Sequence, residues 1–264
     1  MPRSAAAVLG RAAEGCADRL LAARPLIRAE GRMPDGDTPV HYARVACRRL
    51  RSDVRTFERL LDKTWARRVR ANLKWLVDLL GAARDAEVLR ARLRQTGLPV
   101  GAFDEALRER AEIAHADLLA GLDSARLPLL IALLREPVFR GRARRPAHDV
   151  LPALAARPVG RYEEAVADLT AESPVEQWHE VRILAKRARY ALDTAGRRRQ
   201  AKRLARAQSL LGDHQDAIVA AKAWRTLGPA DPETALLLLE REAAAAERAR
   251  DAFLAAAGDP RSVG

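Results

Sequence analysis

Residues 41–51 read HYARVACRRLR, and residues 179–189 read HEVRILAKRAR. The two stretches align without a gap as H-x-x-R-[VI]-x-x-[RK]-R-x-R. Basic and apolar residues recur in both stretches at steps of three and four, which is the spacing of one face of an α-helix. Because the whole pattern occurs twice, it predicts a helical fold that is built from two related halves.

A second repeated motif follows each copy of the first. Residues 79–88 read LLGAARDAEV and residues 210–219 read LLGDHQDAIV, so the order of motifs is the same in both halves. We therefore expect one domain over residues 1–264 that consists of two four-helix bundles, the first over 1–124 and the second over 125–264.

The remaining sequence also favours an all-α fold. Apolar residues recur at steps of three and four almost throughout, and no run alternates with the period of two that strands require. Clusters of Pro and Gly separate the periodic segments. The predicted helices span residues 4–30, 38–62, 64–95, 100–124, 126–135, 148–171, 174–196, 198–226 and 232–257.

Each copy of the first motif places its cations on one face of a helix. At 100° per residue, the members from the first copy fall within about 80° of one another on the helical wheel. We call His41, Arg44, Arg48, Arg51 and Arg55 the first row, and His179, Arg182, Lys186 and Arg189 the second row. Apolar residues occupy the opposite face, which is expected to enter a bundle core: Ala43, Ala46, Leu50, Val54, Phe57 and Leu61 in the first copy, and Val181, Leu184, Ala188 and Leu192 in the second.

The chemistry of the rows indicates an anionic ligand. Cations at three- and four-residue spacing on one helix face repel one another, and no acidic residue interrupts the first row to offset that repulsion. Arginine can bind phosphate oxygens through two parallel hydrogen bonds. The alternative is that the arginines form salt bridges with acidic residues of neighbouring helices. Further cations are expected to widen the patch: Arg49, Arg187, Arg67, Arg70, Lys74, Lys202, Arg203 and Arg206.

Asp85 and Asp216 occupy the same position after the two glycines Gly81 and Gly212, where a turn or bend is expected. We interpret the two aspartates as helix caps or as ion-pair partners of the arginines. A pair of catalytic carboxylates is the alternative.

Composition points to a basic protein in a reducing compartment. The chain has a formal net charge of +12 and a sequence pI of about 10.8, which favours a polyanionic partner. Cys16 and Cys47 lack metal-ligand spacing, and a disulfide is not expected. No apolar run reaches the about 20 residues that span a bilayer. We expect a cytoplasmic protein without a membrane segment.

The repeated motifs resemble those of the CHAD family of histidine-bearing α-helical domains. The resemblance rests on VHYARVACRRLRSDVRTF, WLVDLLGAARDAEVL, WHEVRILAKRARYALD and LARAQSLLGDHQDAIV, in that order. It implies two four-helix bundles related by a pseudo-twofold axis, a central basic cleft, binding of inorganic polyphosphate, and targeting to polyphosphate granules. The family's histidine and basic positions fall on His41, Arg44, Arg48, Arg49 and Arg51, and on His179, Arg182, Lys186, Arg187 and Arg189.

The sequence thus predicts a polyphosphate-binding protein that is not an enzyme and needs no cofactor or metal. The alternative is non-specific and weak binding of nucleic acid, since a basic patch binds duplex DNA through release of counterions. A metal-dependent phosphoanhydride hydrolase is a third reading, but no Gly-rich phosphate loop or clustered metal ligands accompany it. The oligomeric state is left open.

Overall fold

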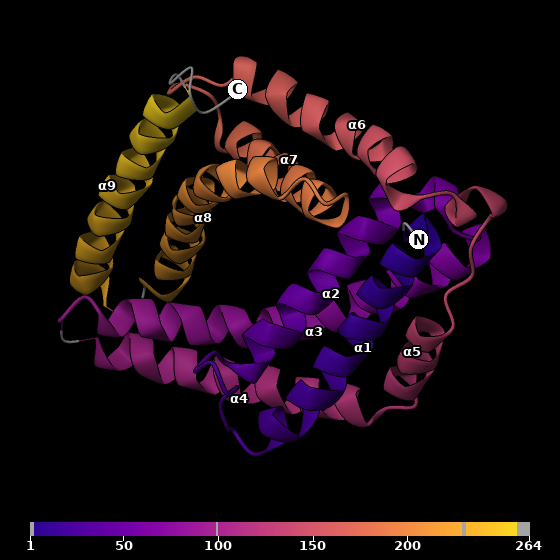
Figure 1. The fold of residues 1–264 in the computed structure, drawn as a ribbon. Helices are drawn as coiled ribbons and strands as arrows, with labels where there is room; N and C mark the ends of the chain where they lie inside the picture. Colours follow the sequence, from indigo (N-terminus) through magenta and orange to yellow (C-terminus); the bar gives the residue numbers. More distant parts are fainter. Residues whose placement is uncertain (1–2, 99, 229–230, 258–264) are drawn as a thin grey trace. The chain divides into compact units, whose positions relative to one another are not determined.

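The segments with helical periodicity form helices in the computed structural model, which describes residues 3–98, 100–228 and 231–257. The helices are α1 (Ala5–Arg28), α2 (Pro39–Thr56), α3 (Lys63–Arg94), α4 (Gly101–Asp123), α5 (Arg126–Arg135), α6 (Ala147–Ala167), α7 (Val175–Thr194), α8 (Arg198–Leu227) and α9 (Pro232–Ala257) (Figure 1). Two 3-10 helices, η1 (Glu58–Leu60) and η2 (Gly141–Arg144), join them. The described residues contain no strand, and the all-α prediction is confirmed.

One predicted helix boundary is wrong. Residues 38–62 do not form a single helix, because α2 ends at Thr56 and η1 turns the chain before α3. Phe57, Leu60 and Leu61 are all buried in this turn, at 0%, 0% and 2% exposure. These three positions keep the spacing of one helix face, so the apolar pattern does not distinguish the turn from a continued helix. In the structure the 3-10 turn carries all three side chains into the core.

The interpretation of Gly81 and Gly212 as turn residues is also wrong. Gly81 lies inside α3 and Gly212 lies inside α8, and both helices continue through them. The glycines have no positive φ, so neither needs the left-handed backbone that only glycine adopts readily.

The chain divides into two compact units by its internal contacts. The first unit contains residues 1–96 and 105–154, and the second contains residues 97–104 and 155–264. The division at residue 124 that the sequence repeat suggests, the pseudo-twofold axis and the central cleft stay predictions.

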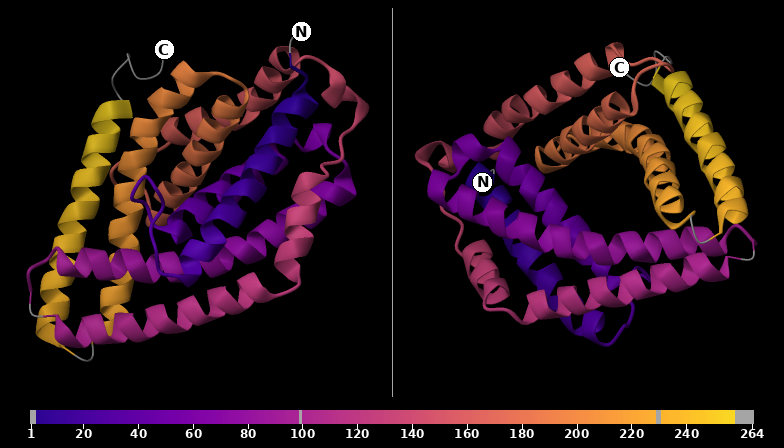
Figure 2. Two further views of the ribbon diagram at one scale, coloured as in Figure 1. Left: turned by 60° about the horizontal axis from the view of Figure 1, so that its bottom comes forward. Right: turned by 180° about the vertical axis from the view of Figure 1, so that it is seen from behind.

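In the first unit, α2 packs against both α1 and α3, and α5 contacts α1 and α3 (Figures 1 and 2). The apolar face predicted for α2 is buried, with Ala43, Ala46, Leu50 and Val54 at 1–4% exposure. Cys16 of α1 and Cys47 of α2 are buried free thiols in the same core. A hydrogen bond with Cys16, together with burial, raises the pKa of the Cys47 thiol.

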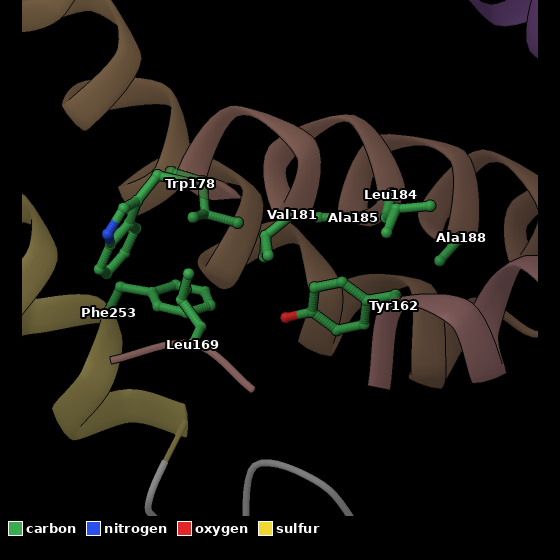
Figure 3. Packing of buried hydrophobic residues seen from close by; sticks show 9 residues of the cluster. Tyr162, Leu169, Trp178, Val181, Leu184, Ala185, Ala188 and Phe253 are labelled. Carbon is green, nitrogen blue, oxygen red and sulfur yellow. The ribbon is translucent and has the colours of Figure 1, made fainter. Parts of the chain in front are cut away.

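In the second unit, α8 packs against α7 and α9. The core of this unit joins side chains of α6, α7 and α9: Tyr162 lies opposite Val181, and Phe253 meets Trp178 edge to face with ring centroids 5.7 Å apart (Figure 3). The apolar face predicted for α7 is buried, since Val181, Leu184, Ala188 and Leu192 are at most 9% exposed. Both rows of cations therefore lie on helices whose opposite face is fixed in a core.

Candidate functional site

The first row begins in the first turn of α2. The hydroxyl of Thr38 accepts a hydrogen bond from the backbone N–H of His41 at 3.2 Å, and Pro39 occupies the first helical position. A hydroxyl cap and a proline at these two positions are both strong signals for a helix start. This local sequence thus sets the register in which the row faces away from the buried side of α2.

The side chains of the first row are accessible to different degrees. The His41 side chain is 39% exposed and that of Arg44 is 25% exposed. Arg48 and Arg51 are half-buried, and Arg55 in the last turn is exposed. The row is therefore open to a ligand, while its stems pack along the helix surface.

Arg44 forms an ion pair with Asp85 of α3, at 3.6 Å from Nη2 to Oδ1. The Asp85 side chain is 57% exposed, so its carboxylate stays in contact with water. Gly81 lies one turn before Asp85, and a methyl group at its Cα would come within 3.7 Å of the Arg44 guanidinium. This is an ordinary van der Waals distance, so Arg44 packs against α3 at residue 81 with room left for a methyl group.

His41 lies among charges of both signs. Its Nε2 is 3.8 Å from Oδ2 of Asp37. Burial lowers the pKa of His41 below its ordinary value of 6.5, and Arg84, Arg44 and Arg48 lower it further, while Asp37 opposes them. A neutral imidazole is therefore favoured near neutral pH in the free protein, and an anion nearby would favour its protonation.

The second row repeats the ion pair of the first. Arg182 of α7 lies 3.9 Å from Asp216 of α8, again with a largely buried arginine and an exposed aspartate. Nδ1 of His179 lies 2.6 Å from Oε1 of Gln215, and Arg189 donates to Gln208 at 3.1 Å. Asp85 and Asp216 are therefore ion-pair partners, and the cap interpretation is wrong because both lie inside long helices.

The flanking cations fall into three groups. Arg70 pairs with Glu58 at 3.6 Å and Lys74 pairs with Asp78 at 2.6 Å, so these two charges are offset locally. Arg49, Arg187 and Lys186 are half-buried on the row helices and have interaction partners. Among these flanking cations, Arg67 on α3 and Lys202, Arg203 and Arg206 on α8 are exposed and form no ion pair with a described residue.

One residue near the first row was not predicted as part of the site. Arg84 of α3 donates to Glu87 at 2.8 Å and lies 3.5 Å from the hydroxyl of Thr38. It therefore stands at the His41 end of the row. The motif GAARD carries a signal for it, because Arg84 directly precedes Asp85, the aspartate that recurs in both copies of the repeat.

Among the described residues, no three His, Cys, Asp or Glu side chains come together as metal ligands. None of the described helices is long and apolar enough to cross a membrane. What the two rows offer chemically is a series of hydrogen-bond donors with positive charge.

A scan against protein-family models matches residues 11–225 to the CHAD domain. The chain belongs to the CHAD domain family. The matched range contains both rows and both Arg–Asp pairs, so the residues of the candidate site lie within the CHAD region.

Solved structures agree with the CHAD assignment. PptA from Streptomyces chartreusis superposes with a TM-score of 0.76 and 26% identity, covering 96% of this chain and 98% of that chain. The CHAD domain from the plant Ricinus communis superposes with a TM-score of 0.74 and 23% identity, covering 99% of this chain and 94% of that chain, which shows the shared fold.

Curated relatives carry the CHAD-like sequence within longer chains. The uncharacterized protein Rv2226 of Mycobacterium tuberculosis is 31% identical over 249 residues, which cover 84% of this chain and 48% of that protein. The uncharacterized protein MT2285 from another strain of the same species is 30% identical with the same coverage. The chain thus spans about half the length of the curated relatives it matches.

Proposed function

We propose that this CHAD protein binds inorganic polyphosphate through the cation rows of α2 and α7. The observation that carries the proposal is the first row, where five cationic or titratable side chains share one accessible face without an acidic residue among them. The recurrence of the row and of its Arg–Asp pair in the second unit supports a function that both copies serve. A linear polyanion can neutralise such a row along its whole length.

Polyphosphate suits the rows better than nucleic acid does. Proteins that bind single-stranded nucleic acid usually stack bases on exposed aromatic side chains. Here Trp65, Trp178 and Trp224 are at most 5% exposed. Tyr42 and Trp75 are half-buried, and the ring of each already has an arginine against it. Polyphosphate has no bases and requires charge and hydrogen-bond donors alone, which the rows supply.

We further propose that the protein acts by binding and catalyses no reaction. Its rows supply donors and positive charge, and the ion-paired aspartates face arginines rather than a nucleophile. Incubation with polyphosphate and divalent metal ions should leave the chain length unchanged on a gel. Metal-dependent release of orthophosphate by the pure protein would revive the hydrolase reading.

The proposal is tested by calorimetric titration with long-chain polyphosphate, duplex DNA and ATP at matched ionic strength. At about 0.2 M salt, polyphosphate should bind much more tightly than duplex DNA, since non-specific duplex binding weakens by orders of magnitude with salt. Equal affinity for both polymers at that salt would favour the nucleic-acid alternative.

A variant that lacks four cations of the two rows, the row variant, tests whether these residues bind polyphosphate. Replacing Arg44, Arg48, Arg182 and Lys186 by Ala should weaken polyphosphate binding by about 1000-fold, because each of the four side chains loses a water-screened phosphate contact of about 1 kcal/mol. The control variant replaces Arg94, Arg110, Arg225 and Arg248 by Ala, four exposed arginines outside the rows, and has the same net charge. Circular dichroism should show unchanged helicity in both proteins. Unfolding of the row variant alone would instead assign the arginines a structural role.

Binding to polyphosphate would also decide where the protein resides. In the cytoplasm we expect it at polyphosphate granules, and a fluorescent fusion of the row variant should disperse where the wild-type fusion forms foci.

A further inference from the structure

A short turn in the first unit carries four arginines that belong to neither row. Residues 140–145 read RGRARR, and η2 (Gly141–Arg144) forms the centre of this segment. We call Arg140, Arg142, Arg144 and Arg145 the arginine turn. All four side chains are exposed, whereas Ala143 between them is fully buried.

The backbone of the arginine turn is held in place on both sides. On one side, the N–H of Arg140 donates to the carbonyl of Leu60 at 2.9 Å. On the other side, the N–H of Ala5 donates to the carbonyl of Arg145 at 3.0 Å, next to an isolated bridge that joins Ser4 and Pro146. With its backbone anchored and Ala143 in the core, the turn must direct its arginines outward, and a ligand would order little beyond the side chains.

The charges of the arginine turn are not offset by acidic side chains. Within the described residues, none of the four arginines takes part in an ion pair. The nearest acidic residue after the turn in sequence is Asp149, whose carboxylate lies 3.2 Å from His148. Four like charges in six residues repel one another, and an anion that binds two or more of them removes this repulsion.

The arginine turn lies next to the end of the first row. The row runs along α2 from His41 to Arg55, about 20 Å at 1.5 Å per residue. η1 follows directly after α2, and its last residue Leu60 is the backbone partner of Arg140. A linear ligand that leaves the C-terminal end of the first row therefore meets the arginine turn within the same unit.

We propose that the arginine turn is a second contact site for a phosphate chain that extends beyond the first row. This inference rests on the proposed function and adds to it a dependence on chain length. Arginine forks match phosphate oxygens, and no exposed aromatic side chain lies in the turn to stack on bases. The turn thus lets long polyphosphate bind more tightly than short polyphosphate.

The test compares an arginine-turn variant, in which Arg140, Arg142, Arg144 and Arg145 are replaced by Ala, with the control variant of equal net charge. Each protein is titrated with tripolyphosphate and with long-chain polyphosphate. The arginine-turn variant should lose about 30-fold in affinity for the long chain and little for tripolyphosphate, while the control should change less than about 3-fold for both. The affinity of the arginine-turn variant should also depend less on salt. The slope of log affinity against log salt should become shallower by about 0.7 for each phosphate contact that is lost.

The outcomes separate this inference from the proposed function. A wild-type protein that fails to bind polyphosphate overturns the proposed function. If the wild type binds but the arginine-turn variant matches the control on long chains and in its salt slope, the second contact is overturned alone. Loss of duplex DNA binding with unchanged polyphosphate binding would also overturn it. Should the fourfold variant lose helicity, Arg142→Gln with Arg144→Gln repeats the test with long polar side chains retained.

Discussion

His41 and His179 occupy the same position in the repeated pattern, but their surroundings in the two units differ. His41 lies among Arg44, Arg48 and Arg84, which together with burial lower its pKa. His179 is exposed and lies against the neutral amide of Gln215. Gln215 takes the place in its motif that Arg84 takes in the first, so one exchange of residue type changes the charge around each histidine.

The C-terminal ends of the two rows also differ in charge, and the first row is again the more basic one. The first row continues to Arg55, whereas the aligned position in the second copy is Asp193. Both copies nevertheless keep the Arg–Asp pair, 44 with 85 and 182 with 216. The Arg–Asp pair between two helices is thus common to both units, whereas the charge that each row presents differs between them.

The largest expected effect separates the two rows by their contribution to affinity. Arg44→Ala with Arg48→Ala should weaken polyphosphate binding by about 100-fold, and Arg182→Ala with Lys186→Ala by about 10-fold, since Lys lacks the bidentate fork and the second row holds fewer cations. Calorimetric titration of the two double variants measures the loss of polyphosphate affinity that each pair of substitutions causes. Equal losses would show that the rows contribute alike despite their different charge.

A smaller effect concerns the aspartates that pair with the rows. Asp85→Asn and Asp216→Asn should each tighten binding about 3-fold at low salt, because an exposed carboxylate repels a phosphate chain and an exposed ion pair contributes only about 0–1 kcal/mol. The gain should vanish at high salt in the same titration. Weaker binding by either variant would mean that the aspartate orients its arginine for the ligand.

The pH dependence of polyphosphate binding should come mainly from His41 in the first row. Bound phosphates favour protonated His41, while its surroundings in the free protein lower its pKa, so binding takes up a proton. Affinity is then constant at alkaline pH, rises as the pH falls through the pKa of the bound state, and levels off below that of the free state. His41→Gln should remove a gain of about 3-fold between about pH 8 and pH 5.5. His179→Gln provides the matched comparison, and an equal loss there would contradict the difference between the rows.

The smallest expected effect concerns the glycines of the two repeats. Gly81→Ala and Gly212→Ala should each stabilise the fold by about 0.5–1 kcal/mol, because Ala favours a helix interior and both positions have room for a methyl group. Thermal unfolding followed by circular dichroism measures the gain. Gly121→Ala is the contrasting control, since its new methyl group would overlap the side chain of Leu79. A loss of stability at Gly81 would show that Arg44 tolerates no neighbour there.

Much of the fold could be predicted because its helices are long and strongly periodic. The apolar pattern predicts the bounds of α5, residues 126–135, and the buried faces of α2 and α7 follow directly from positions such as Leu50 and Val181. The sequence does not predict the helix end at Thr56, because Phe57, Leu60 and Leu61 keep the spacing of one helix face. Gly81 and Gly212 mislead because glycine is typical of turns, yet both lie inside helices with room for a side-chain methyl group.

The sequence predicts which residues form the candidate site better than it predicts which residues they contact. The cations of both rows are visible in the repeat, and Asp85 and Asp216 follow from their matched positions. The role of Arg84 depends on which turn of α3 faces Thr38, and that is a matter of packing between helices. Likewise, the sequence does not place the arginine turn near the first row. The backbone hydrogen bonds of Arg140 with Leu60 and of Asp62 with Val138 bring the turn beside η1, directly after α2.

The buried thiols of the first unit have a practical consequence. Maleimide reagents attack thiolates that they can reach, and Cys47 is buried with its pKa raised, while Cys16 beside it is 2% exposed. A cysteine introduced at an exposed position, such as Ala153→Cys in the first unit or Ala171→Cys in the second, should therefore react first. Dyes can then be attached at chosen points without removing either native cysteine.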